Sequence, residues 1–220
     1  MWKTYLFGLA AVVLVCGCVG TSALDASEVT ALGAMQAQWG KALGWTGSPE
    51  DACATDGAWR GLLCYSGHVV NIYLGGYSLS GSLPAAMGGL SHLEGLGMAF
   101  NALDGPIPAS FANLLKLNVL ELSSNALTGT IPASLLSLPS LERLALDTNF
   151  LSGSLPAHNI STSLISQGTF DAYRNELDGT IPDWICSMGS NKFDISSNSW
   201  SCPQPACCQN GSNSRCGPCL

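Results

Sequence analysis

Apolar residues recur along most of this chain at a fixed spacing. The motif Leu-x-Gly-x-(Leu/Ile)-Pro occurs five times, with its first residue at Leu79, Leu103, Leu127, Leu151 and Leu177. The first three steps between motifs are 24 residues long, and the fourth is 26. A repeat of this length predicts a solenoid, in which each repeat is one coil and neighbouring coils bury each other's apolar side.

Each full repeat reads L-x-x-L-x-L-x-x-N-x-L-x-G-x-I-P-x-x-h-x-x-L-x-x, where h is apolar. Two of its leucines, such as Leu120 and Leu122, are two positions apart and point the same way from a short strand. Stacked strands of this kind predict a parallel sheet along one side of the coil. We expect about five full repeats and one partial repeat over residues 69–200.

An asparagine follows each predicted strand, at Asn101, Asn125, Asn149, Asn175 and Asn198. The chain turns inward there, and backbone groups lose their partners in the sheet. A side-chain amide can satisfy them, because an unsatisfied buried group costs about 1–3 kcal/mol. The sequence therefore predicts a ladder of asparagines that joins successive coils, with Tyr77 in the corresponding position of the first repeat.

Segments outside the repeat frame flank the predicted solenoid. Residues 1–23 carry one lysine, an apolar run and small residues, which predicts a signal peptide cleaved near Ala23; an uncleaved anchor is the alternative. Residues 24–68 are expected to form an amino-terminal cap, with a helix opening at Ser27. Residues 201–220 are expected to form a cysteine-rich carboxyl-terminal cap. Residues 158–167 depart from the frame and predict a bulge.

Eight cysteines follow the predicted cleavage site: Cys53, Cys64, Cys186, Cys202, Cys207, Cys208, Cys216 and Cys219. An even number behind a signal peptide predicts four disulfides, whereas a zinc site among the last four is the alternative. We expect Cys53 to pair with Cys64 and Cys186 with Cys202, leaving Cys207 and Cys208 to pair with Cys216 and Cys219 in either order. Two sequons predict glycans on Asn159 and Asn210.

Charge and hydropathy indicate the compartment of the protein and limit the classes of partner that it can bind. The whole chain has a net charge of −7 with no basic cluster, which argues against nucleic acid or an anionic membrane as partner. No second long apolar run follows the first, so we expect no membrane span in the mature chain. Together with the signal peptide, these features predict a secreted protein of the extracellular space or cell wall.

Catalytic and metal-binding patterns are missing from the sequence. His68, His92 and His158 have no partner at a spacing typical of metal ligands, and solvated side chains are the expectation for all three. The sequence contains no nucleophile elbow, no phosphate-binding loop and no paired-carboxylate motif. We therefore expect neither an enzyme nor a cofactor nor a metal site.

Binding residues are expected at the outward positions beside the two strand leucines. The candidates are Tyr73, Phe100, Glu121, Arg143, Asp147, Asp171, Tyr173 and Arg174. Tyrosine and arginine dominate the energetics of protein interfaces, which favours the neighbourhood of Tyr173 and Arg174. The alternative is a mixture of charges that simply keeps an exposed sheet soluble.

The repeat motif, together with Cys53-x5-Trp59-x-Gly61-x2-Cys64, is similar to the plant-type extracellular leucine-rich repeats. That family includes polygalacturonase-inhibiting proteins and the ectodomains of receptor-like kinases, and the resemblance covers about residues 25–198. It implies an α/β repeat solenoid of the plant-specific type, with a parallel concave sheet and a second strand in the L-x-G-x-I-P turn. It also implies short helical or 3-10 convex turns and cysteine-bearing caps. The carboxyl-terminal cap has more cysteines than is usual, and the polygalacturonase inhibitors have about twice as many repeats.

Three functions are compatible with these features. The first is a non-catalytic recognition module for a protein or peptide in signalling or defence, with a receptor ectodomain or a secreted glycosidase as candidate partner. The second is an inhibitor of a secreted enzyme that degrades cell-wall glycans. The third is a structural wall protein or an ice-binding protein. An ice-binding face would need a regular Thr or Asn array, and the position between the strand leucines reads Tyr, Gly, Glu, Ala, Asp, Asp.

Overall fold

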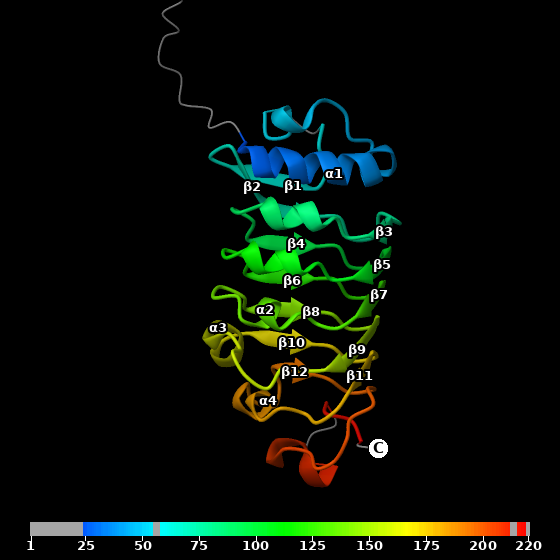
Figure 1. Ribbon diagram of the computed structural model, residues 1–220, viewed down its shortest axis with the longest axis vertical. Helices are drawn as coiled ribbons and strands as arrows, with labels where there is room; N and C mark the ends of the chain where they lie inside the picture. Colours follow the sequence, from blue (N-terminus) through cyan, green and yellow to red (C-terminus); the bar gives the residue numbers. More distant parts are fainter. Residues whose placement is uncertain (1–23, 55–57, 212–214, 219–220) are drawn as a thin grey trace, which may run out of the picture.

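Each repeat forms one coil, and the coils stack along the long axis of the molecule (Figure 1). The computed structural model describes residues 24–54, 58–211 and 215–218; the side chains of residues 209–211 are not described. The predicted signal peptide, Cys219 and the side chain of Asn210 therefore lie outside what is described.

A seven-stranded sheet runs along one side of the stack, in the order β1-β2-β4-β6-β8-β10-β12. Its strands are β1 (Leu62–Tyr65), β2 (His68–Tyr73), β4 (Gly95–Gly97), β6 (Val119–Glu121), β8 (Arg143–Ala145), β10 (Thr169–Asp171) and β12 (Phe193–Asp194). The pairing of β1 with β2 is antiparallel, and every later pair is parallel. The predicted parallel sheet is confirmed, and the cap adds one antiparallel strand at its amino-terminal edge.

The L-x-G-x-I-P turns form a second parallel sheet, in the order β11-β9-β7-β5-β3. Its strands are β3 (Ser80–Ser82), β5 (Ala102–Pro106), β7 (Ala126–Gly129), β9 (Phe150–Ser154) and β11 (Glu176–Asp178). The motif glycine bends the chain at the end of the strand: Gly129, for example, has φ +75°, a conformation that favours glycine. The second strand that the resemblance implies is therefore present.

Short helical turns complete each coil on the convex side. They are the 3-10 helices η2 (Ala85–Gly89) and η3 (Ala109–Asn113) and the α-helices α2 (Ala133–Leu136), α3 (Thr162–Ser166) and α4 (Trp184–Ser187). Pro84, Pro108 and Pro132 stand immediately before their helices, where the missing N–H costs nothing. In the coil of 26 residues the helix begins later, at Thr162, and exposed Asn159 lies in the longer connection.

The predicted asparagine ladder is present between the coils. Asn125 illustrates it: its Oδ1 accepts a hydrogen bond from the backbone N–H of Leu103 at 3.1 Å. Its Nδ2 donates to the carbonyls of Met98 and Leu122, each at 3.0 Å. One amide thus joins a coil to the one before it, while fully buried leucines fill the interior.

The amino-terminal end is covered by α1 (Ala26–Leu43), with the 3-10 helix η1 (Pro49–Asp51) after it. The helix buries Leu32, Met35 and Trp39, as expected, but its N-cap is Asp25 and not Ser27. The Asp25 carboxylate accepts from the Glu28 N–H at 2.9 Å, and the Glu28 carboxylate accepts from the Asp25 N–H at 3.3 Å. Hydrogen bonds from the Ser27 hydroxyl and the Glu28 N–H lower the pKa of Asp25, so the cap is ionised at neutral pH.

Disulfides fasten both ends of the stack. Cys53 pairs with Cys64, as expected, and Cys208 pairs with Cys216, one of the two alternatives for Cys208. The expected Cys186–Cys202 pair is wrong, and so is the expected pairing of Cys207 with Cys216 or Cys219, because Cys186 pairs with Cys207. The 3-10 helix η4 (Ala206–Gly211) packs against α4, which brings Cys207 to Cys186.

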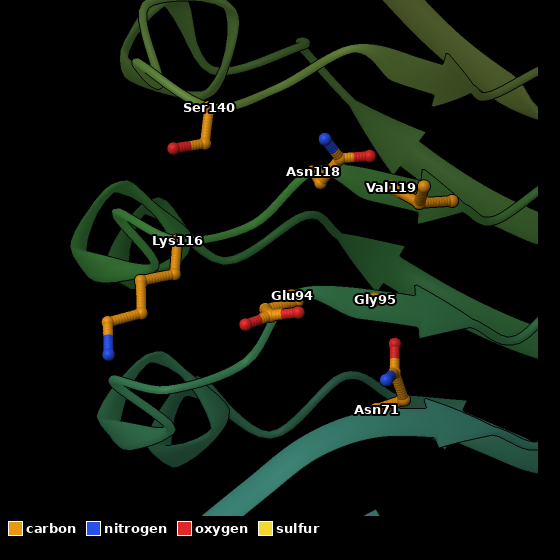
Figure 2. Close-up of a pocket in the computed structure, with 7 residues that line it drawn as sticks. All are labelled: Asn71, Glu94, Gly95, Lys116, Asn118, Val119 and Ser140. Atoms are coloured by element: carbon orange, nitrogen blue, oxygen red, sulfur yellow. The ribbon is translucent and has the colours of Figure 1, made fainter.

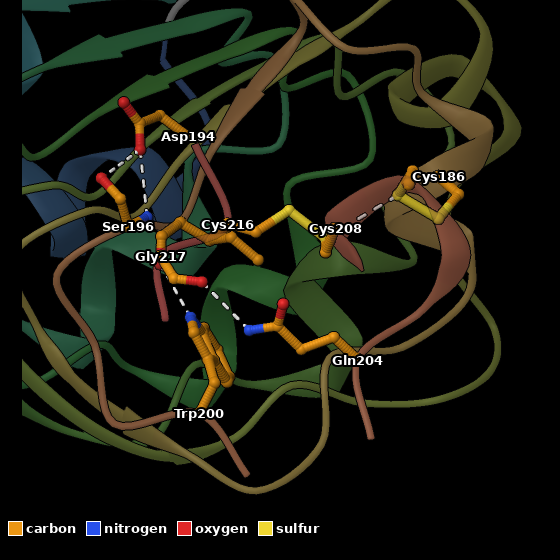
Figure 3. Close-up of a disulfide and its surroundings, with 10 residues drawn as sticks. Cys186, Asp194, Ser196, Trp200, Gln204, Cys208, Cys216 and Gly217 are labelled. Carbon is orange, nitrogen blue, oxygen red and sulfur yellow. Dashed lines mark hydrogen bonds between the residues drawn. A yellow bond between two sulfur atoms is a disulfide. The ribbon is translucent and has the colours of Figure 1, made fainter. Parts of the chain in front are cut away.

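Adjacent Cys207 and Cys208 therefore form bonds in different directions, one to α4 and one to the chain end near Cys216 (Figure 3). Cys202 is also disulfide-bonded. The buried indole of Trp200 donates to the Ile195 carbonyl at 2.8 Å and closes the last coil beneath this cap. Within the described ranges, no helix has both the length and the apolar character needed to cross a membrane.

Candidate binding surface

Outward side chains of the seven-stranded sheet stand in columns, because the parallel strands pair in register. The column between the strand leucines contains Tyr73, Gly97, Glu121, Ala145, Asp171 and Asp194. The positions flanking it supply Arg143, Asp147 and Tyr173. The structure thus places the predicted candidates on one concave surface, but their surroundings differ between its two halves.

Two aromatic side chains stand exposed on the amino-terminal half. Tyr73 is 53% exposed and Phe100 is 72% exposed. Between them lies a hollow of about 550 Å³, lined by Tyr73, Gly75, Gly76, Gly97, Ala99, Phe100 and Glu121. Exposed aromatic side chains beside a hollow are typical of binding surfaces, because they bury a large area at little entropic cost.

Small residues keep this hollow open. A Cβ atom added at Gly97 would lie 3.1 Å from Cδ1 of Tyr73, and one added at Gly75 would lie 3.2 Å from the Ala99 carbonyl oxygen. Both distances are tighter than ordinary van der Waals contacts, so the space depends on the absence of side chains. The Tyr73 hydroxyl donates to Oδ1 of Asn71 at 3.1 Å, which holds the aromatic ring across the glycines.

A polar hollow of about 450 Å³ adjoins it on the same strands (Figure 2). It is lined by Asn71, Glu94, Gly95, Lys116, Asn118, Val119 and Ser140. Asn71 and Gly95 belong to β2 and β4, the strands that carry Tyr73 and Gly97 in the apolar hollow. A Cβ atom at Gly95 would collide with the Asn71 amide. The two hollows therefore lie on the same pair of strands, and we refer to them together as the aromatic groove, with an apolar end and a polar end.

None of the residues that line the polar end was among the eight predicted candidates. Glu94, Lys116 and Asn118 precede the strands, outside the L-x-L positions from which the candidates were chosen. The repeat frame itself could have identified these residues. Glu94 and Asn118 are 24 residues apart, so they occupy equivalent positions of successive coils.

On the carboxyl-terminal half, the predicted candidates largely bind one another. Asp147 is buried, at 9% exposure, and accepts from the Ser123 hydroxyl at 2.5 Å. The charge of Asp147 and a hydrogen bond to it raise the pKa of Tyr173. The Arg174 guanidinium lies 5.9 Å from the centre of the Tyr173 ring, within reach of a cation–π contact. These side chains are already engaged within the protein.

A further candidate of this half, Arg143, forms an ion pair with Glu121, which also lines the apolar hollow. Nε of Arg143 lies 2.6 Å from Oε1 of Glu121, and both side chains are partly exposed. Asp171 stands next to them, and its pKa is raised mainly by burial and also by the charges of Asp147 and Asp194. The carboxyl-terminal half is therefore a polar surface of paired side chains, and its strands β8, β10 and β12 contain no glycine.

Known proteins share this architecture. The family model for the leucine rich repeat matches residues 91–151. The ectodomain of the receptor kinase SOBIR1 from Arabidopsis thaliana is 28% identical, with a TM-score of 0.65, over 80% of this chain and 95% of that one. The BIR2 ectodomain from Arabidopsis thaliana is 27% identical, with a TM-score of 0.68, over 89% of this chain and 100% of that one. A chain of the BIR3–SERK2 complex from Arabidopsis thaliana is 27% identical, with a TM-score of 0.62, over 74% of this chain and 86% of that one.

Proposed function

We propose that this chain, a leucine-rich-repeat protein of the plant extracellular type, is a secreted recognition module that binds a peptide or protein in the aromatic groove. The observation that carries this proposal is the hollow between Tyr73 and Phe100. It combines two exposed aromatic side chains with a floor of glycines. An apolar side chain of a partner fits there and would shield both rings from water.

Burial of the rings provides the affinity. Fully burying an aromatic or large aliphatic side chain stabilises a complex by about 1.5–3 kcal/mol. Tyr73 and Phe100 are each more than half exposed, so most of that gain is still available to a ligand. Tyr173, by contrast, is only partly exposed and lies within the influence of the Asp147 carboxylate and the Arg174 guanidinium.

The polar end of the groove gives the ligand its direction. Glu94 and Lys116 are exposed there and carry opposite charges, while Asn71 and Asn118 offer amide groups. Gly95 and Gly97 are two residues apart in β4, and a strand rises about 3.3 Å per residue. A ligand with an apolar side chain and a polar or charged one two or three residues away matches both ends.

The relatives support a macromolecular partner and an extracellular setting. One of them is a chain of the BIR3–SERK2 complex, in which two proteins assemble. Disulfides at both ends fit an oxidising compartment, and the signal peptide expected over residues 1–23 fits secretion. Asn159 is exposed in the connection before α3, where a glycan would leave the aromatic groove open.

Paired variants test this proposal. The secreted protein would be immobilised and exposed to extracellular extract from the same source, and the captured partners identified by mass spectrometry. Affinities of the purified partner would then be measured for the Tyr73→Ala/Phe100→Ala variant and the Tyr173→Ala/Arg174→Ala variant. We expect the first pair to weaken binding by more than about 2 kcal/mol, roughly thirtyfold. Loss of binding in the second pair alone would move the site to the carboxyl-terminal half, and loss in neither would remove it from the concave face.

A further inference from the structure

Two of the three histidines lie against each other near the amino-terminal end. His68 and His92 are 24 residues apart, one repeat, so they occupy equivalent positions of successive coils. Their rings stack with centroids 3.7 Å apart and planes inclined by 20°. Solvated side chains were expected for all three histidines; His158 is exposed in the bulge, whereas His68 and His92 are only partly exposed and contact each other.

A buried carboxylate orients the first of these rings. Glu28, in the first turn of α1, has no exposed surface. Its Oε2 lies 2.8 Å from Nδ1 of His68, and its Oε1 accepts from the Val69 N–H at 3.1 Å. When Nδ1 carries the proton and donates it to Glu28, Nε2 is left with its lone pair. This is the arrangement by which a carboxylate behind a histidine fixes the tautomer of a metal ligand.

Asp25 brings a second carboxylate to the same place. One potential ligand atom from each of Asp25, Glu28, His68 and His92 lies within 4.8 Å of the others. Three of these residues are partly exposed, so an ion from solvent can reach them. The ligands of a zinc ion lie about 2.0–2.2 Å from it, and so at most about 4.4 Å from one another; these side chains are close enough to surround one ion once they turn toward it.

We propose that His68, His92 and Asp25 bind one divalent transition-metal ion, and that Glu28 positions His68 from behind. Imidazole together with carboxylate suits Zn²⁺, Ni²⁺ and Cu²⁺, whereas Ca²⁺ and Mg²⁺ favour sites built from oxygen atoms. The residues come from the N-cap of α1, from β2 and from the turn before β4. The ion would therefore fasten the cap to the first two coils.

The stacking of the two imidazole rings leads to a specific expectation for metal binding. Parallel rings cannot both direct a nitrogen lone pair at one ion, so one ring must turn. His92 is the ring that turns, because it lies partly exposed in a turn and its Nδ1 contacts only the hydroxyl of the adjoining Ser91, at 3.2 Å, among the described side-chain hydrogen bonds. Metal binding should therefore unstack the two imidazoles.

Zinc titration of the oxidised full chain tests the site. Absence of free thiols would first be verified, so that cysteines cannot bind the ion. Isothermal titration with Zn²⁺ alone should then give one equivalent, and the imidazole nitrogen resonances of His68 and His92 should shift while those of His158 stay. The His92→Ala variant should bind at least about tenfold more weakly, and His158→Ala should match the wild type.

If His68 and His92 served only the fold, the protein would bind none of these metal ions. His92→Ala leaves the Glu28–His68 contact in place, so its fold can be verified by circular dichroism before titration. No binding of Zn²⁺, Ni²⁺ or Cu²⁺ to the wild-type protein would overturn the proposal. So would stoichiometric binding that survives in both His92→Ala and the His68→Gln/His92→Ala double variant.

Discussion

Replacing Asn125 by alanine tests the asparagine ladder in the middle of the stack. The substitution removes the acceptor of the Leu103 N–H and the donor to the Met98 and Leu122 carbonyls. Leu103 is fully buried and Asn125 is only partly exposed, so the Leu103 N–H loses its acceptor where water has limited access. An unsatisfied buried N–H costs about 1–3 kcal/mol, whereas the two carbonyls keep a lone pair for other partners. We therefore expect a loss of about 1–3 kcal/mol in the free energy of unfolding.

Urea unfolding followed by circular dichroism measures this loss, and thermal unfolding gives a second reading. For a chain of this size, 1 kcal/mol corresponds to about 2–4 °C in Tm. The matched control is Ser124→Ala, since Ser124 is the adjoining residue and is partly exposed on the concave side. Its loss should stay within about 0.5 kcal/mol. Equal losses for the two variants, or a loss below 0.5 kcal/mol for Asn125→Ala, would refute the ladder as a source of stability.

Three further outcomes follow from other parts of the structure. Asp171→Asn should be more stable than the wild type at pH 7, because the raised pKa of Asp171 means that the folded state binds its proton more tightly than the unfolded state. This gain in the free energy of unfolding should vanish as the pH falls below the range in which carboxyl groups protonate. A gain that persists at low pH would contradict the prediction. Gly97→Val should fill the apolar hollow against Tyr73 and weaken partner binding at least about tenfold, while the exposed change Ser82→Val on β3 should leave binding unaltered. Cys186→Ser should leave one free thiol on Cys207 and none on Cys202, as peptide mapping with a thiol label would show; a label on Cys202 would contradict the observed pairing.

The repeat frame made much of the fold predictable. The two leucines of each strand and the asparagine after it recur at fixed positions, and local geometry then determines which side each residue faces. Leu120 and Leu122 are buried as expected, and Asn125 bonds across coils as expected. The same frame could have brought His68 and His92 together, since they are one period apart.

Features outside the frame were not predictable in the same way. Asp25 and Ser27 are both good N-cap residues, and only the return hydrogen bond from the Asp25 N–H to Glu28 decides between them. The partner of Cys186 depends on how η4 packs against α4, which no local pattern encodes. The hollow at Gly97 has no positive signal in the sequence, because the absence of a side chain creates the space.

Photo-crosslinking from the aromatic groove tests the central claim most directly. A photoreactive phenylalanine analogue would replace Phe100 beside the groove or, as a control, Phe150 on the second sheet, which is 53% exposed. Both variants would be irradiated with the captured partner, and the crosslinked peptides identified by mass spectrometry. A partner bound in the aromatic groove would be crosslinked from position 100 and not from position 150. A crosslink from position 150 alone would contradict binding in the groove and place the partner on the other sheet.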